Sequence, residues 1–367
     1  MNLAIFSPSQ NPYSETFIQA HKNYLKADKV FYIYGRSLEN MIIEQQGLLL
    51  ESRFRLFLKG VSKISKQSLE KNYNKVVAKK LKKLEVDVAL VEYGNHAMKL
   101  IEVLKSANIP FIAHFHGYDI SVHKVIEENN NYKLLFDSAS YVVVVSQVMK
   151  QSILNLGCPK EKVVYNVYGA NPVFEAIKPK FSKKQVFAVG RFVDKKAPYY
   201  TILAFKKLLE KHTDAKLIMA GQGYLFNMCQ NLVKLYDLQD SVKLVGVVSP
   251  DQVKKYLEES YCFVQHSITT SNGDQEGTPL AVLESAIAGL PVVSTYHAGI
   301  QDVIKHEETG LLCEEHDVNK MAENLIRLFD DVEYAKRLGQ QAKTYHIENY
   351  SLKRHIKTLQ NLIDELV

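Results

Sequence analysis

Short runs of apolar and β-branched residues alternate with helical stretches along nearly the whole chain, and this alternation limits the possible fold more than any other feature. In the first half these runs are 3–7, 30–34, 86–93, 111–116 and 141–146. The pattern resumes in the second half at 185–190, 216–220, 242–247, 261–264, 292–295 and 310–312. Strands that alternate with helices form parallel sheets covered by helices on both faces. The sequence therefore predicts an α/β protein.

The length and composition predict two domains of an ordinary water-soluble kind. A chain of 367 residues can bury two separate cores. The stretch 172–184 holds two prolines and four lysines and is the best linker candidate, so we place the domains at 1–175 and 176–367. No apolar run approaches the roughly 18–20 residues that cross a bilayer. The four cysteines show no metal-binding spacing, and we expect a reduced, cytoplasmic protein.

Ligands of parallel α/β sheets lie beyond the carboxyl ends of the strands, so the residues that follow each strand are informative. After the first strand there is no glycine fingerprint, which disfavours a dinucleotide-dependent dehydrogenase. Arg191 and Lys196 follow the strand 185–190, and two cations in such a place suit a diphosphate, although a charged surface turn would look the same. His116 ends the strand 111–116 and precedes a glycine; it fits either a ligand contact or a structural role.

The stretch 266–299 contains two glutamates, Glu276 and Glu284, with seven residues between them. Gly277 permits close approach of a ligand, and Pro279 is expected at the first position of a helix. The free N–H groups of a helix start attract an anion. Glu284 lies in an otherwise apolar helical run, where a carboxylate needs a partner or a ligand. These features fit a nucleotide sugar. The two glutamates alone would fit a loop charge and a surface residue better, and the position of Glu284 in an apolar run weakens that simpler interpretation.

At this point the chain resembles glycosyltransferase family 4, whose members are retaining enzymes of the GT-B type with two Rossmann-like parallel-sheet domains facing a cleft. The run E-G-T-P-L-A-V-L-E-S-A-I-A-G-L-P-V-V-S-T at 276–295 resembles the E-x7-E element of this family. The segment 190–196 resembles G-R-x-x-x-K-K, 116–119 resembles H-G-x-D, and 169–174 resembles G-x-D-x-x-x-F with Asn171 in the acidic position. The four elements occur in the expected order.

The resemblance implies a role for each matching residue. Catalytic roles fall on His116, Arg191, Lys196 and Glu276. Donor contacts fall on Gly221, Gly223, Gly277, Thr278, Pro279, Leu280 and Glu284. The first domain would bind the acceptor and the second the nucleotide sugar, with the last helix, about 351–367, packing back on the first domain. No D-x-D motif is present, so we expect cationic side chains in place of a metal ion and no cofactor.

The loop after the first strand departs from the glycine pair that many members carry. Its residues Ser14, Glu15, Thr16 and Phe17 resemble a subgroup active in exopolysaccharide and colanic-acid-type assembly, which implies an acceptor-side role. The same residues also fit a helix start capped by Ser14. Both interpretations stay open at this point.

Residues 51–83 hold eleven Lys or Arg and two Glu, interleaved with apolar side chains. Such a segment suits either a solvated helical face or an anionic membrane surface, which would make the protein peripheral on the inner membrane face. Nucleic acid is not expected, because no nucleic-acid-binding module accompanies the patch.

The resemblance implies a retaining glycosyltransferase that moves a sugar from a nucleotide diphosphate, with UDP-sugars favoured. Its acceptor would be a hydroxyl of a glycan or lipid-linked oligosaccharide in cell-surface polysaccharide or capsule biosynthesis. Two alternatives remain at this stage. One is an epimerase or hydrolase of nucleotide sugars with the same fold. The other is a non-catalytic partner protein that binds a sugar nucleotide.

Overall fold

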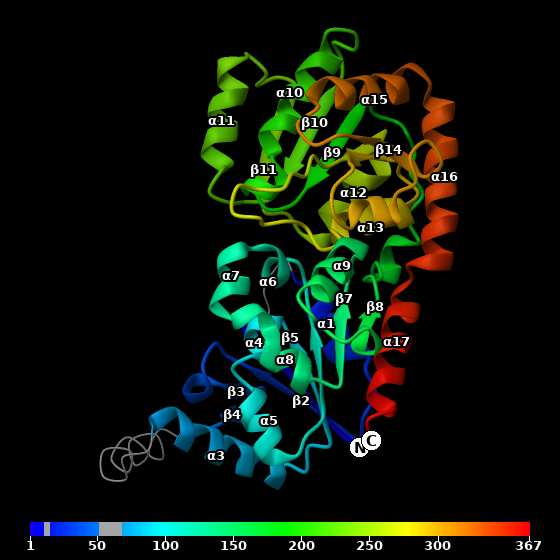
Figure 1. The fold of residues 1–367 in the computed structure, drawn as a ribbon. Coiled ribbons are helices and arrows are strands. Elements are labelled where there is room, and N and C mark those ends of the chain that lie inside the picture. Colours follow the sequence, from blue (N-terminus) through cyan, green and yellow to red (C-terminus); the bar gives the residue numbers. More distant parts are fainter. Residues whose placement is uncertain (11–14, 51–67) are drawn as a thin grey trace. The chain divides into compact units, whose positions relative to one another are not determined.

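The computed structural model is drawn as a ribbon in Figure 1 and forms two compact units. The described residues are 1–10, 15–50 and 68–367. The first unit consists of Met1–Asn166 together with Ile356–Val367, and the second of Val167–His355. The chain therefore enters the second unit once and returns to the first for its last residues.

The first unit is built on an eight-stranded sheet in the order β4-β3-β2-β1-β5-β6-β7-β8. Its strands are β1 (Asn2–Ser7), β2 (Lys29–Tyr34), β3 (Ile42–Ile43), β4 (Gly47–Leu48), β5 (Val88–Glu92), β6 (Phe111–His114), β7 (Tyr141–Val144) and β8 (Val163–Tyr165). The pairs β2–β3 and β3–β4 are antiparallel, and the other pairs are parallel. The short strands β3 and β4 were not predicted, because two residues show no alternation.

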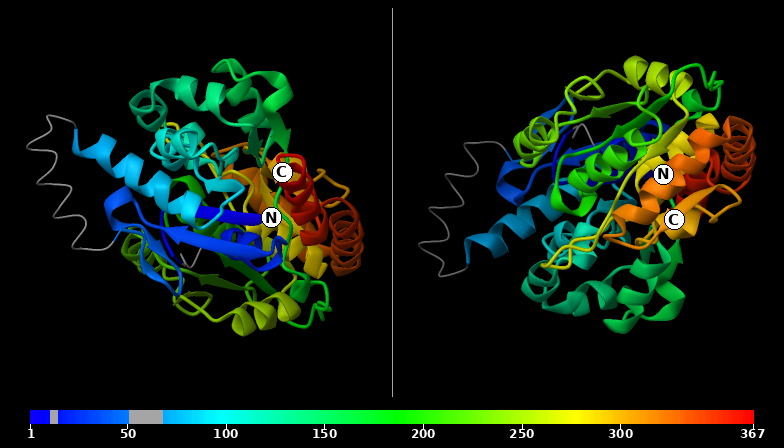
Figure 2. Two further views of the ribbon diagram at one scale, coloured as in Figure 1. Left: turned by 90° about the horizontal axis from the view of Figure 1, so that it is seen from below. Right: turned by 90° about the horizontal axis from the view of Figure 1, so that it is seen from above.

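Helices flank this sheet, and one of them comes from the far end of the chain. They are α1 (Thr16–Tyr24), α3 (Leu69–Lys83), α4 (Gly94–Ala97), α5 (Ile101–Ala107), α6 (Tyr118–Ser121), α7 (His123–Glu128), α8 (Lys133–Ser138), α9 (Gln147–Asn155) and the last part of α17 (Leu352–Asp364). Leu359 and Ile363 of α17 are buried in one cluster with Leu3 of β1. The two chain ends accordingly lie side by side in Figure 2. Ser146 caps α9 by accepting from the N–H of Met149.

The second unit has a six-stranded, entirely parallel sheet in the order β11-β10-β9-β12-β13-β14. Its strands are β9 (Gln185–Val189), β10 (Lys216–Ala220), β11 (Val242–Gly246), β12 (Cys262–Val264), β13 (Val292–Thr295) and β14 (Gly310–Cys313). Its helices are α10 (Pro198–Leu209), α11 (Phe226–Leu235), α12 (Pro250–Glu259), α13 (Leu280–Ala288), α14 (Ile300–Val303), α15 (Val318–Asp330) and α16 (Val332–Asn349). Apart from β11 at the edge of the sheet, most residues of these strands are buried, which explains why they read as continuous apolar runs.

The units divide at 166/167, whereas the sequence placed the boundary at 175/176. The residues after β8 pair with the end of the second unit, which accounts for the difference. Ala170 forms a parallel bridge with Ser351, and the carbonyl of Val167 accepts a hydrogen bond from the ring of His355 at 3.0 Å. A high content of proline and lysine indicates an exposed segment, but it gives no information about pairing between distant parts of the chain.

The basic segment 51–83 is described only from residue 68 onward. In α3 the apolar side chains Tyr73, Val77 and Leu81 are buried, and the helix packs against α5. The exposed side of α3 carries lysines, as in a solvated helical face. Residues 51–67, on which much of the membrane hypothesis rested, lie outside the described part. No helix in the described ranges is long and apolar enough to cross a membrane.

Each sheet reverses its strand order beside its first strand, between β1 and β5 in the first unit and between β9 and β12 in the second. Open α/β sheets bind ligands at this reversal, beyond the carboxyl ends of the strands. In the second unit the loops that leave β9 and β12 carry Arg191, Lys196 and Glu276. In the first unit β5 ends at Glu92. The topology therefore directs attention to these two places.

Candidate functional site

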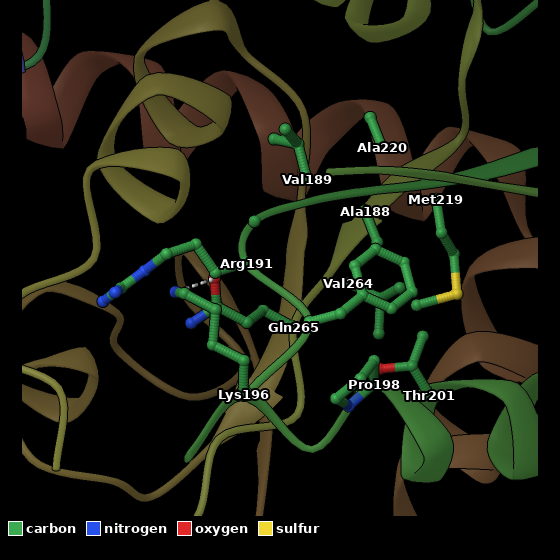
Figure 3. Close-up of a pocket in the computed structure, with 12 residues that line it drawn as sticks. Ala188, Val189, Arg191, Lys196, Pro198, Thr201, Met219, Ala220, Val264 and Gln265 are labelled. Atoms are coloured by element: carbon green, nitrogen blue, oxygen red, sulfur yellow. Dashed lines mark hydrogen bonds between the residues drawn. The ribbon is translucent and has the colours of Figure 1, made fainter. Parts of the chain in front are cut away.

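The loop after β9 carries the two cations that the sequence singled out. The chain passes from Gly190 through a 3-10 turn, Asp194–Lys196, and enters α10 at Pro198. Arg191 is exposed and forms no ion pair among the described residues. Figure 3 shows its guanidinium extending away from a small pocket between β9, β10 and α10. Arg191 is thus available to a ligand at this edge of the sheet.

Lys196 and Glu276 form an ion pair, with 3.0 Å between Nζ and Oε1 and with exposed side-chain fractions of 14% and 9%. The ammonium also donates to Oε1 of Gln265 at 3.3 Å, the dashed line in Figure 3. Burial alone would raise the pKa of Glu276, but Lys196 and Lys195 lower it to about 2. The carboxylate is therefore ionised, and the loop after β12 is tied to the loop after β9.

Lys195, which the sequence analysis did not assign, makes a second tie between these loops. Its buried ammonium donates to Asp274 Oδ1 at 2.9 Å and to the carbonyl of Gln275 at 3.0 Å. Lys195 therefore holds the loop after β12, and Lys196 contacts the carboxylate of Glu276. Sequence alone could not separate these roles, because both residues match the same K-K pair.

A histidine and a glutamate in the loops after β13 and β14 hold the backbone of Glu276. Its N–H donates to Nε2 of His297 at 3.1 Å, and Nδ1 of His297 lies 2.5 Å from Oε1 of Glu315. Because Nε2 accepts, the ring proton is on Nδ1 and points to Glu315. Glu315 also accepts from the N–H of Thr269 at 2.7 Å. The loops after β12, β13 and β14 are thereby joined around Glu276.

We expect His297→Ala to lower the free energy of unfolding by about 1–3 kcal/mol, because the buried N–H of Glu276 loses its acceptor. His297→Gln retains an amide oxygen that can accept and should recover at least half of that loss. Urea denaturation of both variants measures the difference. Equal losses in the two variants would show that the acceptor atom does not matter.

The helix α13 starts one residue later than predicted. Pro279 is the N-cap, with φ −66° and ψ 121°, and Leu280 is the first helical residue. The carbonyl of Pro279 accepts from the N–H groups of Val282 and Leu283. Within the described chain, no acceptor contacts the N–H groups of Leu280 and Ala281. The helix start therefore offers two donors and the positive end of its dipole to an anion.

Gly299 packs so closely against the loop before α13 that it has no room for a side chain. A Cβ on Gly299 would lie 2.1 Å from the carbonyl oxygen of Gly277 and 2.3 Å from Oγ1 of Thr278. The N–H of Gly299 donates to that carbonyl at 3.0 Å. Gly277 and Thr278 thus pack closely against Gly299. A direct donor contact at either residue stays a prediction. At the other end Gly289 ends α13 with φ 91°.

Glu284 lies in the middle of α13 and is partly buried. It makes no hydrogen bond or ion pair with the described residues. Burial raises its pKa to about 8. The carboxyl group is therefore largely protonated at neutral pH in the free protein, and a ligand that donates hydroxyl protons to it would favour its ionised form.

We expect Glu284→Gln to stabilise the free protein as the pH rises. A folded-state pKa of about 8, against 4.5 when unfolded, means that stability is lost between pH 4.5 and 8. The glutamine variant has no such loss and should gain about 1–3 kcal/mol at pH 8, a figure reduced for partial exposure. Chemical denaturation at pH 5 and pH 8 tests this. Glu348→Gln, at an exposed position on α16, should show no such trend.

Gly221 and Gly223, predicted as donor contacts, have a structural role in the free protein. A Cβ on Gly221, whose φ is +129°, would lie 1.9 Å from the carbonyl oxygen of Gly190. One on Gly223 would lie 2.2 Å from the carbonyl oxygen of Phe192. The loop after β10 therefore packs backbone to backbone on the loop after β9. A direct donor contact at either glycine stays a prediction.

In the first unit, His116 follows β6 and is held on several sides. Its Nε2 lies 2.8 Å from Oε2 of Glu92, and its N–H donates to Asp119 Oδ1 at 2.9 Å. The rings of Phe17 and Tyr93 lie 4.5 Å and 4.6 Å from its own. The ring of His114, which lies on the same face of β6, is 4.4 Å away. Glu92 was not found from the sequence, because 24 residues separate it from His116.

The predicted acceptor-side residues lie before and at the start of α1. Glu15 occupies the N-cap position without a side-chain cap, and Thr16 is the first helical residue. The carboxylate of Glu15 lies close enough to the Tyr93 hydroxyl to help burial raise the pKa of that hydroxyl. Ser14 and its predicted cap lie outside the described residues. Asn171, in the acidic position of its motif, instead caps a 3-10 turn by accepting from Val173 N–H.

Comparisons with known proteins identify the family and the fold of the chain. Residues 173–345 match the family described as glycosyl transferases group 1. The amylovoran biosynthesis glycosyltransferase AmsK of Erwinia amylovora is 31% identical over 262 residues, covering 69% of this chain and 64% of that protein. The putative colanic acid biosynthesis glycosyltransferase WcaL of Escherichia coli (strain K12) is 29% identical over 215 residues, covering 58% and 53%. The matched region is thus less than two thirds of either relative.

A solved structure of Anabaena Alr3699/HepE in complex with UDP has a TM-score of 0.78 and 13% identity, and the alignment covers 100% of both chains. At this identity the likeness shows the fold. The two parallel-sheet units are those of the GT-B type. On the motifs, the family match and the fold together, residues 173–345 of this chain belong to the group 1 glycosyl transferases.

Proposed function

We propose that this protein is a retaining glycosyltransferase that moves a sugar from a UDP-sugar to a hydroxyl of a glycan or lipid-linked oligosaccharide during cell-surface polysaccharide biosynthesis. One observation carries the proposal. Arg191, Lys196, Glu276 and the start of α13 converge where the second sheet reverses its strand order. Cations and helix N–H groups at one place stabilise the charge that develops on a departing diphosphate.

The two glutamates fit the sugar parts of such a donor. Glu276 would accept hydrogen bonds from hydroxyls of the transferred sugar, and Glu284 from the ribose. In the free protein Lys196 neutralises Glu276, so donor binding would require this ammonium to be shared between carboxylate and phosphate. The cations supply charge that a divalent ion would otherwise provide, and we propose a reaction without metal or cofactor.

The relatives support the donor and the pathway. HepE was solved with UDP and with UDP-glucose, and AmsK and WcaL are named for amylovoran and colanic acid biosynthesis. Retention of the anomeric configuration and an acceptor site in the first unit follow from the family resemblance. The exposed lysines of α3 would suit an anionic membrane surface that carries a lipid-linked acceptor.

The test is a transfer assay with UDP-, GDP- and ADP-sugars and lipid-linked oligosaccharides, followed by mass spectrometry and by NMR of the anomeric proton. We expect a product one sugar larger, made from a UDP-sugar, with the donor's configuration. Sugar release or isomerisation without an acceptor would favour the hydrolase or epimerase alternative. Donor binding without turnover under every condition would favour the non-catalytic alternative.

A further inference from the structure

Gln265 contacts the ammonium of Lys196, and no sequence motif assigns a role to this glutamine. It follows β12 directly and is 5% exposed. Its Oε1 accepts from Nζ of Lys196 at 3.3 Å, and its Nε2 donates to the hydroxyl of Ser267 at 2.9 Å. Gln265 and Lys196 both line the small pocket in Figure 3. A buried amide thus lies beside one of the two cations proposed to bind the donor.

The orientation of this amide is determined by its partners. An ammonium group can only donate hydrogen bonds, so the amide oxygen of Gln265 must face Lys196. The backbone of Gln265 is also held. Its N–H donates to the carbonyl of Val293 at 3.1 Å, and its carbonyl accepts from the hydroxyl of Ser294 at 2.6 Å. Oε1 of Gln265 is therefore an acceptor in a fixed position.

The side chain of Lys196 is held along its length. Its carbon chain packs on Gly190, where a Cβ would lie 3.0 Å from Cδ and 3.3 Å from Cε. Its ammonium contacts two oxygens among the described residues, Oε1 of Gln265 at 3.3 Å and Oε1 of Glu276 at 3.0 Å. Because an ammonium has three protons, at least one of them is left for a ligand.

The two oxygens would affect a bound diphosphate in different ways. The carboxylate of Glu276 neutralises the ammonium of Lys196 and would repel a phosphate. The amide of Gln265 has no net charge, so it holds the ammonium and leaves its positive charge to the ligand. In the proposed donor complex Glu276 binds hydroxyls of the transferred sugar, and the amide then remains as the partner of the ammonium.

We propose that Gln265 is a positioning residue that keeps the ammonium of Lys196 beside the donor's diphosphate while the carboxylate of Glu276 binds the transferred sugar. The inference rests on the proposed glycosyltransferase function for its ligand. It explains how the ion pair of the free protein can open without loss of the ammonium from the site. An apolar side chain at position 265 would not hold the ammonium, and a carboxylate there would compete with the diphosphate for it.

Isothermal titration of UDP measures the effect on the donor site. Gln265→Met has a side chain of similar length without the amide oxygen, and we expect its UDP affinity to fall about tenfold. Gln265→Glu keeps an acceptor but adds a negative charge, and it should bind UDP more weakly still. Thr201→Val changes a buried residue of the same pocket that is not a partner of Lys196, and should leave the affinity unchanged.

The pKa of Lys196 gives a second readout, which a merely structural role of Gln265 would not change. Burial lowers this pKa, and Glu276 opposes the shift. Loss of the amide oxygen in Gln265→Met should lower the pKa further, because that oxygen stabilises the charged ammonium. The added carboxylate in Gln265→Glu should raise it. ¹³C NMR of lysine-labelled protein follows the Cε signals as the pH rises, and Lys196→Arg assigns the signal of Lys196.

A third variant covers a failure of Gln265→Met to fold. Gln265→Asn keeps the amide but withdraws its oxygen by one methylene group, so the pKa of Lys196 and the UDP affinity should both fall. Unchanged values of both quantities in the folded methionine or asparagine variant would overturn the role of Gln265. So would a glutamate variant that binds UDP as tightly as the unaltered protein.

The two measurements also separate this inference from the proposed function. Absence of binding of any nucleoside diphosphate to the unaltered protein would contradict the proposed donor, and with it the diphosphate as the ligand that Lys196 meets. The NMR titration requires no ligand. It would still show whether the amide of Gln265 holds the ammonium, through opposite shifts of the pKa in the methionine and glutamate variants.

Discussion

Replacing Lys196 by alanine is expected to lower the free energy of unfolding by about 3–5 kcal/mol, because Glu276 is then left charged in a buried site without its partner. The ammonium is the nearest charge to Glu276, at 3.0 Å, and the pair is mostly shielded from water. Guanidinium denaturation at pH 7 measures the loss. The donor should also bind more weakly, since the same ammonium faces the diphosphate in the proposed complex.

A double variant separates the buried charge from general loss of packing. In Lys196→Met with Glu276→Gln, no uncompensated charge remains, and we expect most of the stability to return. Donor turnover should not return, because both proposed functional groups are gone. A double variant as unstable as Lys196→Ala would mean that the ion pair is not what stabilises these loops.

Arg191→Ala is expected to lower kcat/KM by about 10²–10³-fold while changing the free energy of unfolding by less than about 0.5 kcal/mol. Arg191 is exposed and has no ion-pair partner in the described part of the chain, so its removal leaves nothing unsatisfied. Steady-state kinetics with the donor identified by the transfer assay, together with denaturation curves, measure both quantities.

Two further variants serve as controls: a lysine in place of Arg191, and the removal of a different exposed cation. Arg191→Lys keeps a charge but not bidentate geometry and should lose less activity than the alanine variant. Lys243→Ala removes an exposed cation from β11, at the edge of the same sheet, and should retain full activity. Equal activity in Arg191→Ala and Lys243→Ala would exclude Arg191 from the reaction.

Most strands could be predicted because they are short apolar runs, and those in the middle of each sheet are buried on both faces. Runs such as 216–220 and 292–295 coincide with β10 and β13. The antiparallel strands β3 and β4 were not predicted, because two residues are too few to show an alternation of apolar and polar side chains. The predicted boundary between the units differs from the one in the structure, because the boundary depends on contacts between residues far apart in the sequence, such as Ala170 with Ser351.

The motif residues of the candidate site could be found from the sequence because they cluster along the chain, but their partners could not. Glu276 and Lys196 were each assigned by a local pattern, whereas their mutual ion pair depends on the adjacency of β9 and β12. His297 and Glu92 have no motif of their own. They contact Glu276 and His116 only because neighbouring strands end at the same edge of a sheet. Glu284 was the exception, since a carboxylate in an apolar helix is visible in the sequence itself.

The most direct test of the central claim is isothermal titration of UDP into the purified protein, with Arg191→Ala and Glu284→Ala in parallel. The account predicts binding to the unaltered protein, at least about tenfold weaker binding to each variant, and unchanged folding of Arg191→Ala by circular dichroism. Binding that is equal in all three proteins would contradict the placement of the donor at this edge of the second sheet. No binding of UDP, combined with binding of another nucleoside diphosphate that both variants lose, would keep the site and replace the donor.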